Sequence, residues 1–335
     1  MKLGLIGAGR IGKLHAELLN AHVPAAEIKT VAEIYIDEVK EWANRHRILN
    51  LTTDYADILN DAEIEAVLIC SSTDTHARLI TEAADAGKHI FCEKPIDFNI
   101  EKIKQALTSV KAVGVKLQIG FNRRFDHNFK KVHELVASGK VGDVHIVKIT
   151  SRDPAPPPTE YLKVSGGIFL DMTIHDFDMA RFLSLSEVEE VYAQGAVLID
   201  PAIGDLGDVD TAIITLKFKN GAVGVIDNSR QAVYGYDQRV EVFGSKGCVE
   251  VKNDLPNSAK LSTAEGVVSE KPLYFFLERY KMSYVDELKA FVNAVANDQE
   301  PAVTGNDGLQ PVLIGVAALK SLNEKRPVKI EEIEA

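Results

Sequence analysis

The chain has 335 residues, 46% of them hydrophobic and 26% charged, which is enough for two globular domains with separate cores. Its formal net charge of -11 argues against nucleic acid as the partner, because binding to a phosphate backbone needs a positive face. No apolar run is long enough to span a membrane, and the chain opens in a strand pattern without a signal peptide, so we expect a cytoplasmic protein.

The cysteine pattern argues against a structural metal site. Cys70, Cys92 and Cys248 form an odd set without the paired Cys/His spacing of a metal site. We therefore predict three buried thiols in a reducing compartment and no structural metal.

A glycine-rich motif follows the first predicted strand, residues 2–6. Gly7, Gly9 and Gly12 form the pattern G-x-G-x-x-G before a predicted helix over residues 13–20. In this context the first glycine makes a tight turn, the second lets the backbone approach a pyrophosphate, and the third lets helix and strand pack closely. The motif predicts a dinucleotide-binding loop, and an ordinary strand-turn-helix without a ligand is the alternative.

An acidic residue follows the second predicted strand, residues 28–32. Glu33 lies about 20 residues after Gly12, where a carboxylate can accept hydrogen bonds from the adenosine ribose hydroxyls. The same carboxylate repels a 2′-phosphate, which favours NAD over NADP. Arg10, beside the glycine loop, is the argument for NADP, because an arginine can bind that phosphate.

Strands and helices continue to alternate up to residue 120. Strands are predicted at residues 66–70, 89–92 and 116–120, and helices at 75–86 and 100–113. After the strand that ends at residue 70, Ser71, Ser72 and Thr73 supply hydroxyls and a helix N-cap, and His76 either caps or contacts a cofactor. Residues 1–120 therefore predict an α/β doubly wound Rossmann domain that binds NAD.

The strand over residues 89–92 runs into the turn Glu93-Lys94-Pro95. In an open α/β sheet, ligands bind beyond the carboxyl ends of the strands, so Lys94 is expected where cofactor and substrate meet. Proline restricts the backbone of Lys94 and fixes the direction of its ammonium group. An exposed charged turn without a function is the alternative.

The pattern changes after residue 120. Alternating strands are predicted at residues 144–151, 188–196, 211–218, 222–228, 239–243 and 247–252, with hairpin signals at Asn220-Gly221 and Lys246-Gly247. Residues 121–335 therefore predict an α+β domain with a large, mostly antiparallel open sheet, which binds the substrate and forms the oligomer. Helices over residues 279–297 and 308–323 close the chain and can pack on either domain.

Two polar residues in this second half have helical spacing. Asp171 and His175 are four residues apart, which places them on one face of a single helix turn. A histidine that is oriented by a carboxylate can act as general base for an alcohol proton. The alternative is a weak ion pair on a helix surface, to which we assign Asp176 and Asp178.

Over essentially its full length the chain resembles the glucose-fructose oxidoreductase/inositol dehydrogenase/rhizopine catabolism (Gfo/Idh/MocA) family. The similarity rests on the glycine loop, on Glu93-Lys94-Pro95 and on Asp171 with His175, and residues 120–126, 151–154, 171–178 and 234–237 resemble the bacterial myo-inositol 2-dehydrogenases within that family. The resemblance implies NAD-dependent oxidation of a cyclitol ring hydroxyl, from myo-inositol to 2-keto-myo-inositol (scyllo-inosose), by a homotetramer built through the exposed face of the second sheet. Alternatives are another inositol isomer (scyllo- or D-chiro-inositol), a glucose-like sugar, or a nucleotide-binding regulator without catalysis.

The resemblance also implies the residues of the site. It assigns catalysis to Lys94, Asp171 and His175, and these three contact the substrate together with Asn122, Arg123, Asp153 and Tyr236. Some inositol dehydrogenases have methionine in place of Asn122 and asparagine in place of Asp153, which leaves the preferred stereoisomer open. The predicted cofactor-binding residues are Gly7, Gly9, Arg10, Ile11, Gly12, Glu33, Ser71, Ser72, Thr73, His76, Glu93 and Lys94.

Overall fold

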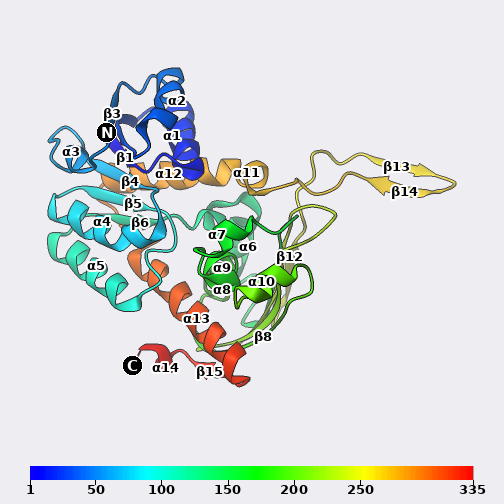
Figure 1. Cartoon of the computed structure of the whole chain (residues 1–335). Helices are drawn as coiled ribbons and strands as arrows, with labels where there is room; N and C mark the ends of the chain where they lie inside the picture. Colours follow the sequence, from blue (N-terminus) through cyan, green and yellow to red (C-terminus); the bar gives the residue numbers. More distant parts are fainter. Residues whose placement is uncertain (335) are drawn as a thin grey trace. The chain divides into compact units, whose positions relative to one another are not determined.

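The computed structural model describes residues 1–334, which form two compact units (Figure 1). The first unit comprises Met1–Asn122 and Met282–Val312, and the second comprises Arg123–Lys281 and the chain from Leu313 onward. The chain thus returns to the first unit before it ends in the second. None of the helices in residues 1–334 has the length and apolar content that a bilayer crossing requires.

The first unit is built on a six-stranded, all-parallel sheet in the order β3-β2-β1-β4-β5-β6. This order confirms the predicted doubly wound Rossmann fold. Every residue of the central strand β4 is buried, as expected for a strand covered on both faces. Only β3 was missed, because its three residues are too few to show a pattern. The strands are β1 (Lys2–Ile6), β2 (Glu27–Ala32), β3 (Asn50–Thr52), β4 (Ala66–Ile69), β5 (His89–Cys92) and β6 (Leu117–Ile119).

Helices cover this sheet, and one of them comes from the far end of the sequence. Phe291 of α12 lies edge-on to Phe91 of β5, with ring centroids 5.9 Å apart, and Gln118 Nε2 donates to the Glu287 carbonyl at 2.9 Å. Helix α12 therefore completes the core of the first unit. The helices are α1 (Arg10–His22), η1 (Ile36–Glu38), α2 (Lys40–Arg45), α3 (Ala56–Leu59), α4 (Thr73–Asp85), α5 (Ile100–Val113), α12 (Lys281–Ala296) and the first part of α13 (Gly305–Glu324).

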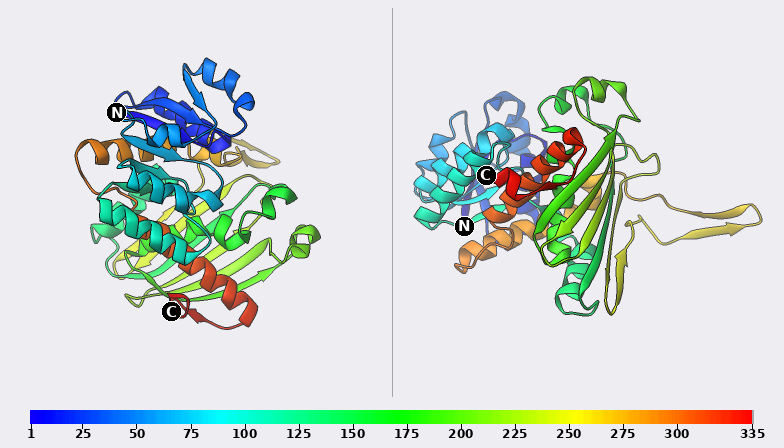
Figure 2. Two further views of the ribbon diagram at one scale, coloured as in Figure 1. Left: turned by 60° about the vertical axis from the view of Figure 1, so that its left-hand side comes forward. Right: turned by 90° about the horizontal axis from the view of Figure 1, so that it is seen from below.

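The second unit is built on a seven-stranded sheet in the order β12-β11-β7-β10-β9-β8-β15. All neighbouring strands are antiparallel except β7 and β10, so the predicted mostly antiparallel sheet is confirmed. Along β9 buried and exposed residues alternate, and the helices of the unit lie on one face of the sheet (Figure 2). The strands are β7 (Val144–Arg152), β8 (Val188–Ala196), β9 (Thr211–Phe218), β10 (Val223–Ser229), β11 (Asp237–Gly244), β12 (Gly247–Val251) and β15 (Val328–Lys329).

A two-stranded hairpin, β13 (Lys260–Thr263) with β14 (Gly266–Ser269), extends from this unit, and all of its strand residues are exposed (yellow in Figure 1). No sequence pattern predicted this hairpin, because neither strand alternates between buried and exposed faces. The remaining helices are η2 (Asn122–Phe125), α6 (His127–Ala137), α7 (Thr159–Leu162), α8 (Gly167–Asp171), α9 (Ile174–Ser184), α10 (Pro201–Asp205), α11 (Phe276–Arg279) and α14 (Glu331–Glu334).

The cysteines correct one prediction. Cys70 and Cys92 are buried free thiols, as expected, but Cys248 is exposed. Cys248 lies on β12, an edge strand whose side chains face solvent rather than the core. The prediction of three buried thiols was therefore wrong for this residue.

Candidate cofactor and substrate sites

A side chain would meet different surroundings at each of the three glycines of the first loop. Gly7 has a positive φ of +90°, and a Cβ there would lie 2.6 Å from the backbone nitrogen of Ser71. A Cβ on Gly12 would lie 2.1 Å from the Gly7 carbonyl oxygen. A Cβ on Gly9 would meet no protein atom within 4 Å. The first and third glycines are thus required by the packing of the chain, whereas the second leaves space for a ligand.

The space beside Gly9 suits an anion. Gly9 is the N-cap of α1 and has no side-chain capping bond, and the first turn of α1 contains Arg10 and Ile11. The first backbone N–H groups of a helix lack intrahelical partners and attract negative charge. The loop therefore fits the pyrophosphate of a dinucleotide.

Glu33 lies at the same loop. Its Oε2 accepts a hydrogen bond from the Ala8 N–H at 2.8 Å, and its Oε1 accepts one from the Tyr35 N–H at 3.1 Å. These bonds hold the half-buried carboxylate beside the glycines, and each oxygen keeps a lone pair for a further donor. Its role as the ribose contact stays a prediction.

The turn after β4 is tied to the turn after β5 by His76. This histidine is 2% exposed; its Nε2 lies 3.0 Å from the Ser71 carbonyl and its Nδ1 lies 2.9 Å from the Pro95 carbonyl. The Ser71 hydroxyl lies 2.6 Å from that of Thr75. Helix α4 begins two residues earlier than predicted, and its N-cap, Ser72, makes no side-chain capping bond. His76 therefore supports both turns, and its contact with a cofactor stays a prediction.

The Glu93-Lys94-Pro95 turn is not an exposed charged turn. Glu93 is 8% exposed and its Oε1 lies 2.6 Å from Nε2 of His15, while Lys94 is half-buried. The Lys94–Pro95 peptide bond is cis. The alternative of an exposed charged turn was therefore wrong for Glu93, because this carboxylate is part of the core.

In the second unit, Asp171 and His175 lie on two different helices. The four-residue spacing had predicted that they share one helix turn, so this prediction was wrong. Helix α8 ends at Asp171 and α9 begins at Ile174. The break occurs at Thr173, whose N–H donates to the Ile168 carbonyl five residues back at 2.9 Å. This hydrogen bond spans five residues, whereas the hydrogen bonds of an α-helix span four, so the regular helix α8 ends here.

Asp171 has two further partners. The Tyr161 hydroxyl donates to its Oδ1 at 2.7 Å, and Arg230 Nη1 donates to its Oδ2 at 3.1 Å. Arg230 is 1% exposed and lies 3.7 Å from Asp208. Arg230 was not predicted as a site residue, because no motif or spacing distinguishes a single arginine after a strand. That Asp171 orients His175 stays a prediction.

A second buried network joins two predicted substrate residues, Arg123 and Tyr236, to Asp176. Arg123 Nη1 donates to Asp176 Oδ1 at 2.6 Å, and Arg123 Nη2 donates to the Tyr236 hydroxyl at 3.4 Å. Asp176 is fully buried and also accepts from Asn228 Nδ2 at 2.9 Å. Its assignment to a weak surface pair was therefore wrong. Asp178 corrects the same assignment, since it is 1% exposed and bound by Arg124 through two nitrogens.

Asp153 titrates near neutrality. Burial raises the pKa of this carboxyl to about 7; Arg230 and Arg123 act to lower it, and the carboxylates of Asp171 and Asp176 act to raise it. The predicted residues Arg123, Asp153, Tyr236 and Asp171 thus lie in one electrostatic neighbourhood of the second unit.

Asn122 belongs to the first unit. It is 2% exposed, and its Nδ2 donates to no partner among the described residues. A buried amide donor of this kind is available for a ligand.

Comparison with known proteins gives one consistent family. Residues 1–121 match a family model described as "Oxidoreductase family, NAD-binding Rossmann fold", and residues 129–250 match the "GFO/IDH/MocA C-terminal domain". The chain is 54% identical to the uncharacterized oxidoreductase YrbE of Bacillus subtilis, over 99% of this chain and 97% of the relative. It is 50% identical to the myo-inositol 2-dehydrogenase of Thermotoga maritima, over 99% of each chain.

The solved structures agree with this similarity. The crystal structure of scyllo-inositol dehydrogenase from Lactobacillus casei with bound NAD(H) and scyllo-inositol superposes with a TM-score of 0.92. The two sequences are 29% identical, and the match covers 99% of each chain.

The glycine loop gives a matched pair of substitutions. Gly9→Ala should melt like the wild type but bind NADH about tenfold more weakly or worse, because its methyl group enters the open space. Gly12→Ala should instead lower the melting temperature, because its methyl group meets the Gly7 carbonyl. Fluorescence titration with NADH and a melting curve for each variant measure both effects. Wild-type NADH affinity in Gly9→Ala would contradict a pyrophosphate site at this loop.

Asp153 gives a pH-dependent stability. In the unfolded chain an aspartate loses its proton near pH 3.9, whereas folded Asp153 keeps it up to about pH 7. The stabilisation from this proton is therefore complete at low pH and is lost as the pH rises through 7. Asp153→Asn cannot lose a proton, so its melting temperature should rise relative to the wild type between about pH 4.5 and about pH 7.5.

The matched control is Asp205→Asn, because Asp205 is exposed on α10. An Asp153→Asn difference that stays constant across this pH range would show that Asp153 is ionised throughout.

Proposed function

The chain belongs to the Gfo/Idh/MocA oxidoreductase family with an NAD-binding Rossmann fold, and from this premise we propose that it oxidises a cyclitol ring hydroxyl with NAD. The reaction proposed is myo-inositol to 2-keto-myo-inositol (scyllo-inosose). The full-length similarity to the T. maritima myo-inositol 2-dehydrogenase is the observation that supports this substrate most directly.

In this proposal one of the two domains predicted from the sequence binds the cofactor and the other binds the substrate. Residues 1–120 bind NAD, which supplies the hydride acceptor when bound, and residues 121–335 bind the substrate. The glycine loop binds the pyrophosphate. The carboxylate of Glu33 accepts hydrogen bonds from the ribose hydroxyls, and its negative charge repels a 2′-phosphate. The open side of Gly9 and the position of Glu33 at the loop support these roles.

Lys94, Asp171 and His175 are the proposed catalytic residues. His175 takes the proton of the reacting hydroxyl, and Asp171 orients its ring and stabilises the imidazolium that results. Lys94 binds the substrate oxygen and stabilises the negative charge that develops on it. The two bonds from Tyr161 and Arg230 to Asp171 support this role, because they fix the carboxylate in place.

Asn122, Arg123, Asp153 and Tyr236 are the proposed substrate contacts. A cyclitol presents a hydroxyl on every ring carbon, and each hydroxyl both donates and accepts, so its binding site needs donors and acceptors together. Arg123 and the Asn122 amide supply donors, whereas Asp153 and Tyr236 can accept. The buried polar network around Arg123 supports this assignment.

A second substrate is favoured by one observation. The L. casei relative binds scyllo-inositol, so the same fold accepts an isomer that differs from myo-inositol at one carbon. Initial rates with NAD and NADP on myo-, scyllo- and D-chiro-inositol and on glucose separate these possibilities. We expect the highest kcat/KM with myo-inositol and NAD. NADH binding without turnover of any of these compounds would favour the non-catalytic regulator.

We also propose a cytoplasmic homotetramer that forms through the exposed face of the seven-stranded sheet. Ile213, Val223 and Phe243 lie on strands of this sheet and are 45%, 49% and 43% exposed, which gives the sheet apolar surface that a second copy of the chain can cover. The three free cysteines are typical of a reducing compartment. Light scattering of the purified protein tests the tetramer.

Lys94→Ala should reduce kcat by about 10²–10³, because one charge-stabilising donor in a closed site has roughly this effect on the rate. NADH affinity should change little, since the lysine acts on the substrate oxygen. The matched control is Lys104→Ala, which removes a lysine from the exposed side of α5 in the same unit. A loss of less than about tenfold in kcat would remove Lys94 from the catalytic centre.

A further inference from the structure

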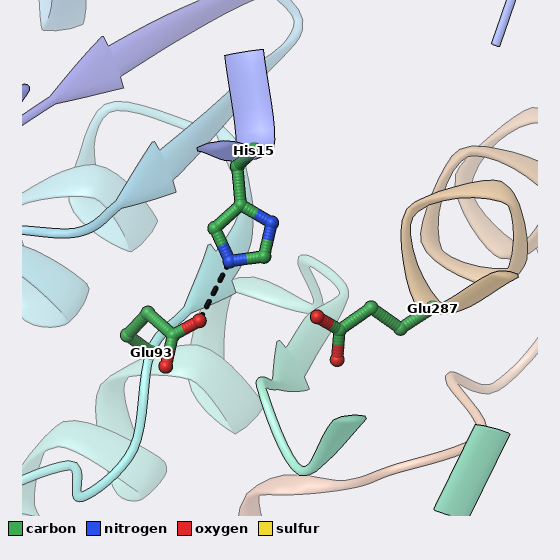
Figure 3. Close-up of side chains that lie close together, drawn as sticks. All are labelled: His15, Glu93 and Glu287. Atoms are coloured by element: carbon green, nitrogen blue, oxygen red, sulfur yellow. Dashed lines mark hydrogen bonds and ion pairs between the residues drawn. The ribbon is translucent and has the colours of Figure 1, made fainter. Parts of the chain in front are cut away.

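Three ionisable side chains meet inside the first unit, and two of them, His15 and Glu287, have no role in the proposed function. His15 of α1, Glu93 after β5 and Glu287 of α12 lie close together (Figure 3). They are 0%, 8% and 0% exposed. One ligand-type atom of each lies within 4.8 Å of the others, and His15 Nε2 is 2.6 Å from Glu93 Oε1. We call these residues the His-Glu-Glu cluster.

Glu287 is the unexplained member of the cluster. Its side chain points toward His15 and Glu93 (Figure 3), yet neither carboxylate oxygen has a hydrogen-bond partner among the described residues. The surroundings are largely apolar, because the rings of Phe91 and Tyr284 lie edge-on to His15 with centroids 5.0 and 5.6 Å away. An ionised carboxylate would be strongly disfavoured in such a place.

The negative charges of the two carboxylates in the cluster can be neutralised in two ways. Two carboxylates and one imidazole become neutral overall if they bind two protons or one divalent cation. The ligand atoms around a single metal at about 2.1 Å lie roughly 3 Å apart or more. The 2.6 Å between His15 and Glu93 is too short for that and is typical of a charge-assisted hydrogen bond. The geometry therefore favours protons.

The surroundings of Glu287 favour a proton on its carboxyl group. Burial raises the pKa of the Glu287 carboxyl well above its usual range, and the negative charge of Glu93 raises it further. Cys70 and Cys92 are the neighbouring titratable groups, and burial together with the Glu93 charge raises the pKa of both thiols, so they stay neutral. Tyr284 is a further ionisable side chain at the cluster, and its ring contacts His15.

We propose that Glu287 is a protonated, neutral acid that stabilises the Glu93–His15 ion pair, and that this cluster positions the Lys94 turn relative to the glycine loop. His15 lies on α1, the helix that begins at the glycine loop, and Glu93 directly precedes Lys94. A Cβ on Gly120 would lie 3.1 Å from Glu93 Oε1, so the backbone of the next strand end also packs on this carboxylate. The positioning role rests on the proposed function of Lys94.

Glu287→Gln tests the protonation, because glutamine has the shape of the protonated acid and no charge. The folded pKa of Glu287 is raised, so the stabilisation from its proton is present at low pH and is lost as the pH rises above about 4.3. The melting temperature of Glu287→Gln minus that of the wild type should therefore increase with pH, while kcat stays within about threefold.

Infrared difference spectra provide a direct readout on the protein without substrate. The wild type should show the carbonyl band of a protonated carboxylic acid that Glu287→Gln lacks. Absence of this band, together with a Glu287→Gln variant that melts earlier at every pH, would show that Glu287 is ionised. Release of one equivalent of a divalent metal on unfolding would show the cation alternative instead, and either result overturns the proposal.

A pair of His15 variants tests the positioning. His15→Phe keeps an aromatic ring against Phe91 but removes the donor to Glu93, so kcat should fall about tenfold while NADH affinity changes less than about twofold. His15→Gln can still donate to Glu93 and should restore part of the rate. Equal rates in both variants, or a wild-type rate in His15→Phe, would contradict the positioning role. If the wild type oxidises no cyclitol, the proposed function and the positioning role fail together, while the infrared band still decides the state of Glu287.

Discussion

An ionised side chain that leaves water must be neutralised where it lies, and both units of this protein are arranged around that constraint. In the second unit the guanidinium groups of Arg123 and Arg230 are buried and bind the carboxylates of Asp176 and Asp171. In the first unit His15 binds Glu93. Of the catalytic residues that we propose, Asp171 belongs to such a pair and Lys94 directly follows Glu93 in the chain, which restricts the positions of both.

The same arrangement explains how one group can titrate near neutral pH. Asp153 lies among two arginines and two aspartates, so the opposing charges largely cancel and burial determines that its pKa is about 7. A protonated carboxyl can donate as well as accept, whereas a carboxylate can only accept. The pH thus changes which hydroxyl contacts Asp153 can make.

Local patterns in the sequence were sufficient for the fold and for the glycine loop. Buried apolar runs, glycine spacing and hairpin signals act between near neighbours, and they predicted the Rossmann fold, the second sheet and the loop at Gly9. They failed where contacts are distant, because His15 and Glu93 are 78 residues apart and no spacing connects them. The expected single helix through Asp171 and His175 was also wrong, since the spacing of these residues does not predict the bond from the Thr173 N–H to the Ile168 carbonyl that ends the first helix.

The central claim is that this chain removes a hydride from the ring carbon of a cyclitol and transfers it to NAD. Incubation with myo-inositol deuterated at the reacting carbon, followed by mass spectrometry of the reduced cofactor, tests this claim most directly. The account predicts deuterium on the nicotinamide ring and a slower initial rate than with unlabelled myo-inositol. Reduced cofactor without deuterium, or no reduced cofactor at all, would contradict it.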